Sequence, residues 1–179
     1  MFSVVSREAG CYNALNRAAV GRRRSIGKEE TIFRAGPADS STLAALAGQL
    51  WLRADPAALE AEFVELTERG DAACFLCCAE GRAVGFAQSS LRHDYVEGTD
   101  SSPVGYLEGI FVLPEYRNRG LAAALLARCE SWAREQGCAE FASDCELGND
   151  GSLAFHLALG FEEANRIICF RKALRQGGG

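Results

Sequence analysis

Residues 114–123 combine features that could bind a phosphate group. An apolar run ends at Pro114, and a helical pattern begins after Gly120. The first N–H groups of a helix lack partners within the helix, and the helix dipole makes this end positive, so such a turn attracts anions. Gly120 has no Cβ to obstruct a close ligand, and Arg117 and Arg119 add positive charge. A pyrophosphate site and an ordinary basic turn are both consistent with these residues alone.

Two carboxylates lie in strand patterns on either side of this helix. Glu108 belongs to an apolar run over 104–113, and Asp144 lies near the end of a second run over 139–145. Ligands of α/β proteins bind at the carboxyl ends of strands, which is where Asp144 is expected. A carboxylate can bind an ammonium group through charge-assisted hydrogen bonds, and it can accept a proton from an amine.

The eight cysteines do not form a metal-site pattern. Cys74 and Cys77 have CxxC spacing, but residues at this spacing on the predicted strand 73–79 point to opposite faces. No second CxxC and no histidine pair completes a zinc site, so no metal is expected. Most of the cysteines fall within apolar patterns, which favours reduced, buried thiols over a disulfide framework.

Alternating strand and helix patterns surround these residues and must position them. Apolar runs predict strands over 31–35, 73–79, 83–91, 104–113, 139–145, 161–163 and 166–172. Helical spacing of apolar residues predicts helices over 37–53, 56–69, 121–136 and 151–159. This order predicts an α/β protein, with a single central mixed β-sheet flanked by helices.

Length and composition are those of one ordinary globular domain. The chain has 179 residues, of which 48% are hydrophobic and 24% charged, and it has no apolar run long enough to cross a membrane. The net charge is −5 at pH 7, although residues 1–28 carry six basic residues against Glu8 alone. The acidic remainder argues against a nucleic acid partner and is compatible with a cationic substrate, although solubility alone would also explain it.

Residues 1–28 are expected to form a mobile extension ahead of a domain over 29–174, and residues 175–179 a disordered tail. The extension is rich in arginine but has no continuous apolar stretch of the kind that a secretory signal requires. We therefore expect a cytoplasmic protein with no membrane partner.

Two motifs resemble those of the GNAT superfamily of N-acetyltransferases. Arg117-x-x-Gly120-x-Ala122, after a Val-x-Pro strand end, is similar to the superfamily's acetyl-CoA signature, and residues 157–161 are similar to its second, shorter motif. The resemblance covers about residues 31–174. It implies the GNAT fold, with acetyl-CoA as cosubstrate.

The resemblance also implies which residues contact acetyl-CoA. The backbone of Ile110, Phe111 and Val112 would pair with the pantetheine amides as another strand would. The pyrophosphate would be held by the loop and first helical turn, namely Arg117, Asn118, Arg119, Gly120, Leu121, Ala122 and Ala123. Asn149 would make a further contact with acetyl-CoA.

A long polar segment, 91–109, resembles the aminoglycoside 6'-N-acetyltransferases, and shorter matches at 49–51, 142–144 and 160–163 agree. The resemblance implies acetylation of the 6'-amine of aminoglycoside antibiotics, which confers resistance, and a homodimer. Aminoglycosides carry several ammonium groups on sugar rings, which suits carboxylates and aromatic faces. The residues implied to contact substrate are Trp51, Tyr95, Glu108 and Asp144.

Other interpretations of these positions remain open. Trp51 also fits the apolar face of a helix, and Tyr95 could order its own loop. The chain departs from the subgroup at Ala54, where a histidine is common, and at Asn165, where an acidic residue is common. Both positions could contact the substrate or a neighbouring subunit.

The implied reaction is direct attack of the amine on the thioester within a ternary complex. Glu108 or Asp144 would accept the proton, directly or through water. No cysteine has a recognised neighbouring base, so an acyl-cysteine intermediate is not expected. His156 stands where many GNAT enzymes have the tyrosine that protonates the leaving thiolate, and it could do the same or simply pack. Two alternatives are acetylation of another amine, such as a polyamine or a protein N-terminus, and a non-catalytic acyl-CoA-binding module.

Overall fold

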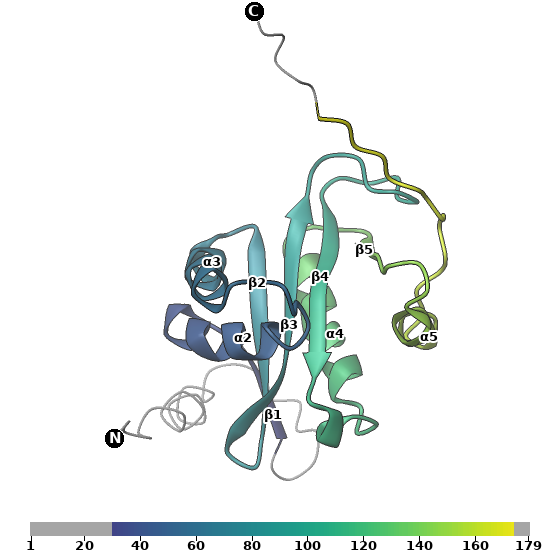
Figure 1. Ribbon diagram of the computed structural model, residues 1–179. Helices are drawn as coiled ribbons and strands as arrows, with labels where there is room; N and C mark the ends of the chain where they lie inside the picture. The colour runs from purple at the N-terminus through teal and green to yellow at the C-terminus, as the bar shows by residue number, and fades with distance from the viewer. Residues whose placement is uncertain (1–29, 174–179) are drawn as a thin grey trace, which may run out of the picture. The chain divides into compact units, whose positions relative to one another are not determined.

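The computed structural model describes residues 30–173 (Figure 1). The chain divides into two compact units, the first ending at Asp144 and the second starting at Cys145. The predicted extension over 1–28 and tail over 175–179 lie outside the described residues.

The first unit is built on a five-stranded sheet in the order β1-β2-β3-β4-β5 (Figure 1). The strands are β1 (Glu30–Arg34), β2 (Ala72–Ala79), β3 (Arg82–Arg92), β4 (Val104–Val112) and β5 (Phe141–Ser143). Strands β1 to β4 pair antiparallel with one another, and β5 pairs parallel with β4. The predicted mixed sheet is therefore confirmed, although β5 is shorter than the predicted 139–145.

Helices α2 (Ser40–Ala47) and α3 (Pro56–Glu68) cover one face of the sheet. Helix α3 begins where Asp55 accepts a hydrogen bond from the N–H of Ala58 at 2.9 Å, and Pro56 occupies the first helical position. Apolar residues at helical spacing on α3 then pack with α2 and the sheet. This core includes Leu43, Leu46, Leu59, Phe63, Leu66, Cys74, Leu76 and Phe86.

Helix α4 (Leu121–Glu135) covers the opposite face. Gly85 and Phe86 are neighbours on β3, so their side-chain positions point to opposite faces. Phe86 packs in the core beneath α2 and α3, whereas a Cβ on Gly85 would lie 3.4 Å from Leu125 of α4. The buried residues of α4 recur at helical spacing, as expected of the predicted helix over 121–136, and are Leu121, Leu125, Leu126, Cys129, Trp132 and Ala133.

The predicted helix over 37–53 is too long. A 3-10 turn, η1 (Pro37–Asp39), precedes α2, and α2 ends before Gly48. The N–H groups of Leu50 and Trp51 then both donate to the carbonyl of Ala47, at 2.9 and 2.8 Å, which turns the chain back on itself. Gly48 has low helix propensity, which explains why the helix ends there although the apolar spacing continues beyond it.

The second unit contains α5 (Asp150–Ala158), as predicted, but the predicted strands over 161–163 and 166–172 are wrong. Residues 161–173 have no regular secondary structure. Ile167, Ile168 and Phe170 are exposed by 59%, 76% and 92%. A β-rich composition cannot make a strand without a neighbouring strand to accept and donate hydrogen bonds, and none of the described strands pairs with this segment.

The described cysteines follow the expectation of reduced, buried thiols only in part, since Cys145 and Cys169 are free but exposed. Cys74, Cys77 and Cys129 are buried free thiols, and burial raises the pKa of each to about 12. Cys78, however, is disulfide-bonded, so the expectation of reduced thiols fails there, because a disulfide depends on which sulfur atoms the fold brings together. Over residues 30–173, no helix has the length and apolar character needed to cross a membrane.

Candidate active site

Glu108 is positioned by a β-bulge in β4. Gln88 of β3 pairs with Gly109, and the next residue, Ser89, pairs with Leu107, so Glu108 is the extra residue on β4. A bulge bends its strand and changes the direction of a side chain. The carboxylate of Glu108 accepts a hydrogen bond from the hydroxyl of Ser90 on β3.

Arg92, at the end of β3, forms an ion pair with Glu108. Its Nη2 lies 2.9 Å from Oε2 and 3.1 Å from Oε1 of the carboxylate, and its Nε lies 3.3 Å from Oε1. The Arg92 guanidinium also stacks over the ring of Tyr106, with its carbon 3.4 Å from the ring centroid. Both members of the ion pair remain accessible, with 42% of the Arg92 side chain and 26% of the Glu108 side chain exposed.

Asp144 follows β5 and is reached by Tyr106 of β4. The parallel register pairs Tyr106 with Ala142 of the neighbouring strand, and Asp144 lies just past the end of that strand. The Tyr106 hydroxyl donates a hydrogen bond to Oδ1 of Asp144. Burial, and then this hydrogen bond, raise the pKa of Tyr106 well above its ordinary value, so the hydroxyl stays protonated. Tyr106 therefore contacts Asp144 directly and is linked to Glu108 through Arg92.

The two predicted aromatic contacts lie in different surroundings. A Cβ on Gly109 would lie 2.8 Å from the Trp51 ring, so glycine at this position lets the indole lie directly on β4, beside Glu108. Trp51 also packs edge-on against Phe86, with ring centroids 6.0 Å apart. Tyr95, by contrast, is 80% exposed, and its hydroxyl donates to Glu97 at 3.0 Å.

Past the end of β5, the outer edge of β4 has no strand beside it among residues 30–144. Strand β5 pairs only with Gly105, Tyr106 and Leu107, so the β4 edge continues past it through Ile110 and Phe111. The backbone groups of such an edge can pair with an added extended chain. Val112, the third predicted residue, has its carbonyl occupied by the Arg117 Nε at 3.0 Å.

The loop before α4 has the backbone geometry of an anion site. Asn118 and Gly120 have φ of 60° and 78°, and α4 begins without a side-chain cap. The first intrahelical bond runs from Ala124 to Gly120, which leaves the N–H groups of Leu121, Ala122 and Ala123 without helical acceptors. A Cβ on Gly120 would meet no protein atom within 4 Å, so within the protein it is the positive φ, rather than crowding, that favours glycine.

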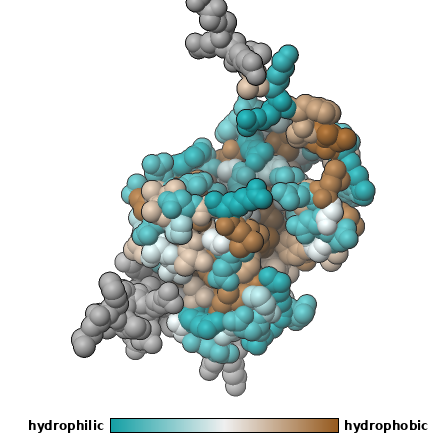
Figure 2. Space-filling view, viewed as in Figure 1, coloured by the Kyte–Doolittle hydropathy of each residue, from teal (hydrophilic) through white to brown (hydrophobic). Residues whose placement is uncertain are grey.

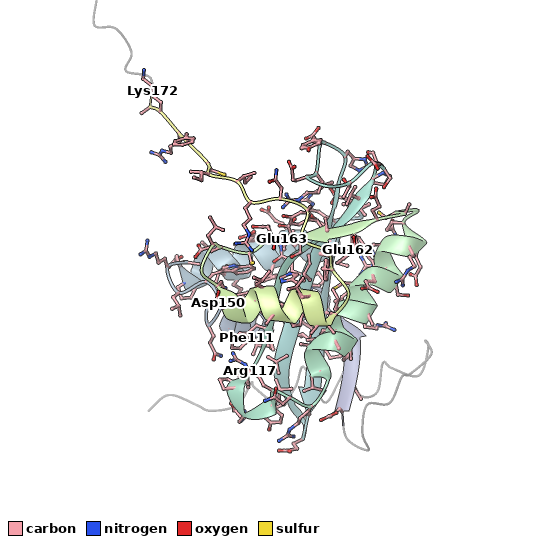
Figure 3. All side chains as sticks on the ribbon, turned by 90° about the vertical axis from the view of Figure 1, so that its right-hand side faces the viewer. Phe111, Arg117, Asp150, Glu162, Glu163 and Lys172 are labelled. Carbon is pink, nitrogen blue, oxygen red and sulfur yellow. The ribbon has the colours of Figure 1, made fainter. Side chains whose placement is uncertain are left out.

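The two loop arginines are directed partly toward the protein itself. Arg117 lies with its guanidinium carbon 5.7 Å from the Phe111 ring, and Figure 3 shows the two side chains near each other. Arg119 donates to the carbonyl of Glu115 at 3.3 Å. Their predicted contacts with a pyrophosphate would require the guanidinium groups to use other N–H groups or to turn.

Asn149 and His156 lie in the second unit and have clear local contacts there. Asn149 caps α5 by accepting a hydrogen bond from the N–H of Ser152 at 3.1 Å. Nδ1 of His156 lies 2.7 Å from the carbonyl of Ser152, which can only accept, so Nδ1 carries the hydrogen and Nε2 is the basic nitrogen of the neutral ring. The imidazole packs edge-on against Phe155 and Phe161.

Sequence reasoning missed three residues of this site, namely Ser90, Arg92 and Tyr106. Alternation was the available signal, because Ser90 and Arg92 share one face of β3, and Tyr106 lies opposite Ser90 on β4. Within residues 30–173, no three His, Cys, Asp or Glu side chains come together as metal ligands would.

An open strand edge beside an uncapped helix terminus can bind an extended molecule that ends in a phosphate group, and the nearby carboxylates of Glu108 and Asp144 can bind an amine. The chain belongs to the acetyltransferase (GNAT) family, whose model matches residues 42–161. It is 44% identical over 149 residues to an aminoglycoside N(6')-acetyltransferase type 1 of Stenotrophomonas maltophilia, covering 83% of this chain and 97% of that protein. The corresponding protein of Salmonella typhimurium strain LT2 is 48% identical over 124 residues, or 69% and 86% of the two chains.

Solved structures agree with this assignment. A structure of AAC(6')-Iy in complex with the bisubstrate analog CoA-S-monomethyl-acetylneamine has a TM-score of 0.79 and 42% identity, over 82% of this chain and 100% of that one. The 6'-N-acetyltransferase AAC(6')-Ih from Acinetobacter baumannii has a TM-score of 0.76 and 38% identity, over 81% and 99%. Within the GNAT family, the chain therefore belongs with the aminoglycoside N(6')-acetyltransferases, and the predicted family and fold are confirmed.

Proposed function

We propose that this protein transfers the acetyl group of acetyl-CoA to the 6'-amine of aminoglycoside antibiotics and so confers resistance to them. The observation that carries the proposal is the connected cluster next to the open edge of β4, in which Tyr106 binds Asp144 directly and is linked to Glu108 through Arg92. Family membership supports the reaction, and solved relatives bound to CoA or a CoA-linked analogue support the cosubstrate.

Acetyl-CoA would lie along β4 and end at α4. Its pantetheine amides would pair with the backbone of Ile110, Phe111 and Val112, as a further strand would. Its pyrophosphate would accept hydrogen bonds from the N–H groups of Leu121, Ala122 and Ala123, with Asn118 and Gly120 shaping the turn and Arg117 and Arg119 adding charge. Asn149 is proposed as a further contact, made by the amide nitrogen that its capping role leaves unused.

The aminoglycoside would bind through its ammonium groups. Asp144 and Glu108 supply negative charge, and Trp51 offers a ring beside β4 for a sugar face. Tyr95 is proposed as a further contact from an exposed loop, where its hydroxyl donates a hydrogen bond to Glu97. An exposed side chain of this kind can order around a ligand with little loss of packing.

Acyl transfer would occur by direct attack of the amine on acetyl-CoA, with no acyl-enzyme intermediate. One carboxylate accepts the proton of the ammonium, the amine attacks the thioester carbonyl, and the backbone N–H groups of β4 stabilise the oxyanion. The C–S bond then breaks, and the attacking nitrogen loses its second proton to solvent. We propose that the leaving thiolate takes its proton from Nε2 of His156 in the imidazolium form, in which both ring nitrogens carry hydrogens, because Nδ1 keeps its hydrogen bond to the carbonyl of Ser152. The buried cysteines cannot serve as nucleophiles, since burial raises the pKa of Cys74, Cys77 and Cys129 to about 12.

We also propose that the protein is a cytoplasmic homodimer. Apolar residues scattered over a mostly hydrophilic surface need no explanation, and Figure 2 shows such a surface. Ile167, Ile168 and Phe170 are different, because they follow one another in an extended segment that has no strand partner. A second copy of the chain would supply the missing backbone partners and cover these side chains.

The reaction is tested by release of free thiol from acetyl-CoA in the presence of a panel of amines. Kanamycin and tobramycin, which carry a 6'-amine, should be turned over, whereas an aminoglycoside with a 6'-hydroxyl and the polyamine spermidine should not. Equal turnover of 6'-amino and 6'-hydroxyl compounds would exclude the 6' position, and turnover of spermidine alone would favour a polyamine acetyltransferase. Acetyl-CoA binding without any turnover would favour a binding module.

A further inference from the structure

Tyr106 contacts one proposed substrate carboxylate, Asp144, and also the arginine that holds the other, Glu108. Its hydroxyl donates to Asp144, and its ring faces the guanidinium of Arg92 at 3.4 Å. The tyrosine is 7% exposed and packs in a small core with Val96 and Val104. Because this packing fixes the ring, it also fixes where the hydroxyl and the guanidinium lie.

Arg92 needs such a support. Its side chain is 42% exposed at the end of β3, and a flexible arginine at this exposure gains little from one ion pair alone. Stacking on an aromatic ring orients the guanidinium, so that its planar group meets both oxygens of Glu108. Ser90 then adds a third group that holds the same carboxylate.

The cluster also has a definite charge. Glu108 and Asp144 carry two negative charges between them, and Arg92 offsets one of these. One net negative charge remains, which matches a single ammonium group. The Tyr106 hydroxyl has one hydrogen and gives it to Asp144, so it orients that carboxylate without changing the total charge.

We propose that Tyr106 is a positioning residue, whose hydroxyl orients Asp144 and whose ring holds Arg92 against Glu108, so that the two carboxylates act as one site for a single ammonium group. The proposal rests on the proposed function, since it takes Asp144 and Glu108 to be the substrate carboxylates. It assigns Tyr106 no contact with the reacting atoms. Its effect passes through the orientation of Asp144 and through Arg92.

The test is steady-state kinetics of Tyr106→Phe with tobramycin and acetyl-CoA. This change removes the hydroxyl but keeps the ring, so KM for tobramycin should rise about tenfold, as expected for losing a hydrogen bond to a charged group. KM for acetyl-CoA and kcat should stay within about twofold, because Arg92 and Glu108 keep their ring support. A purely structural role would instead lower the amount of active enzyme and leave both KM values unchanged.

Tyr116→Phe is the matched control. Tyr116 is also buried, and its hydroxyl also donates to a carboxylate, that of Glu80 at 3.1 Å. Its KM for tobramycin should equal that of the wild type. An unchanged KM in Tyr106→Phe, or an equal rise in Tyr116→Phe, would overturn the proposal.

A double-mutant cycle separates this proposal from the proposed function. If Tyr106 acts through Asp144, then adding Tyr106→Phe to Asp144→Asn should raise KM for tobramycin by less than about twofold. Full additivity would overturn the positioning role while leaving Asp144 in the site. If Asp144→Asn alone has wild-type kinetics, the carboxylate site itself is wrong. Tyr106→Leu, which removes the ring as well, should lower kcat in addition, because Arg92 loses its support.

Discussion

Arg92 holds both carboxylate oxygens of Glu108, with its Nη2 2.9 Å from Oε2 and 3.1 Å from Oε1. The charge of Glu108 is thus already compensated before any substrate arrives, whereas Asp144 accepts a hydrogen bond from the neutral hydroxyl of Tyr106. This asymmetry suggests a division of labour between the carboxylates. Asp144 would mainly attract the ammonium, and Glu108 would mainly act on the proton.

The carboxylate variants test that division. Asp144→Asn should mainly raise KM for the aminoglycoside, because a charge-assisted hydrogen bond contributes on the order of 1.5–3 kcal/mol. Glu108→Gln should mainly lower kcat, by roughly 100-fold if Glu108 is the base. Steady-state kinetics with tobramycin measure both. Glu130→Gln is the control, since Glu130 also pairs with an arginine, Arg134 at 2.8 Å, but lies on α4; wild-type kinetics in both site variants would refute the site.

Gly120→Glu should abolish acetyl-CoA binding. The new side chain would place a carboxylate at the proposed pyrophosphate site and would also strain a residue with φ of 78°. Gly137→Glu provides the comparison, because Gly137 has φ of 88° and open space around it just beyond the opposite end of α4. Calorimetric titration should show binding lost in the first variant and kept in the second. Equal affinities in the two would mean that the phosphates bind elsewhere.

Glu140 should contribute a pH-dependent part of the stability. It accepts hydrogen bonds from the Ser101 hydroxyl and from the N–H groups of Asp100 and Ser101, and these lower the pKa of its carboxyl below the ordinary 4.5. A lowered pKa stabilises the folded state above about pH 4.5, and this contribution is lost as the pH falls through the folded-state value. Glu140→Ala should therefore lower Tm by a few degrees near neutral pH.

The thermal stabilities of the wild type and of Glu140→Ala should become more alike at low pH. Thermal unfolding of the wild type and Glu140→Ala, followed by circular dichroism, should show a Tm difference that shrinks below about pH 4.5. A Tm difference that is constant across this range would mean that the charge of Glu140 is not what holds the loop.

Ile168→Asp should shift the protein from dimer to monomer. Ile168 is 76% exposed in the extended C-terminal segment, so a charge there costs the isolated chain little but would have to be buried in a dimer interface. Sedimentation velocity measures the change. Leu52→Asp is the control, since Leu52 is 84% exposed in a turn of the first unit. A wild type that sediments as a monomer at all concentrations would contradict the proposed dimer.

The sequence by itself determined the local features. The helix predicted over 56–69 begins at Pro56, helical spacing of apolar residues predicted α4, and Gly120 marked the turn before it. Each of these depends on residues within one or two helical turns, whose backbone preferences act over the same short range. The family motif is local in the same way, which is why it could be found without the fold.

Only the tertiary structure decided which side chains meet. Arg92 reaches Glu108 because β3 and β4 pair with a one-residue bulge, and without that bulge the side chains after it would point to the other face. Tyr106 reaches Asp144 because β5 pairs parallel with β4 in one particular register. The C-terminal segment shows the converse, since its composition predicted strands that no neighbouring strand completes. Pairing between distant segments is a property of the whole sheet, so the residues of one strand cannot specify it.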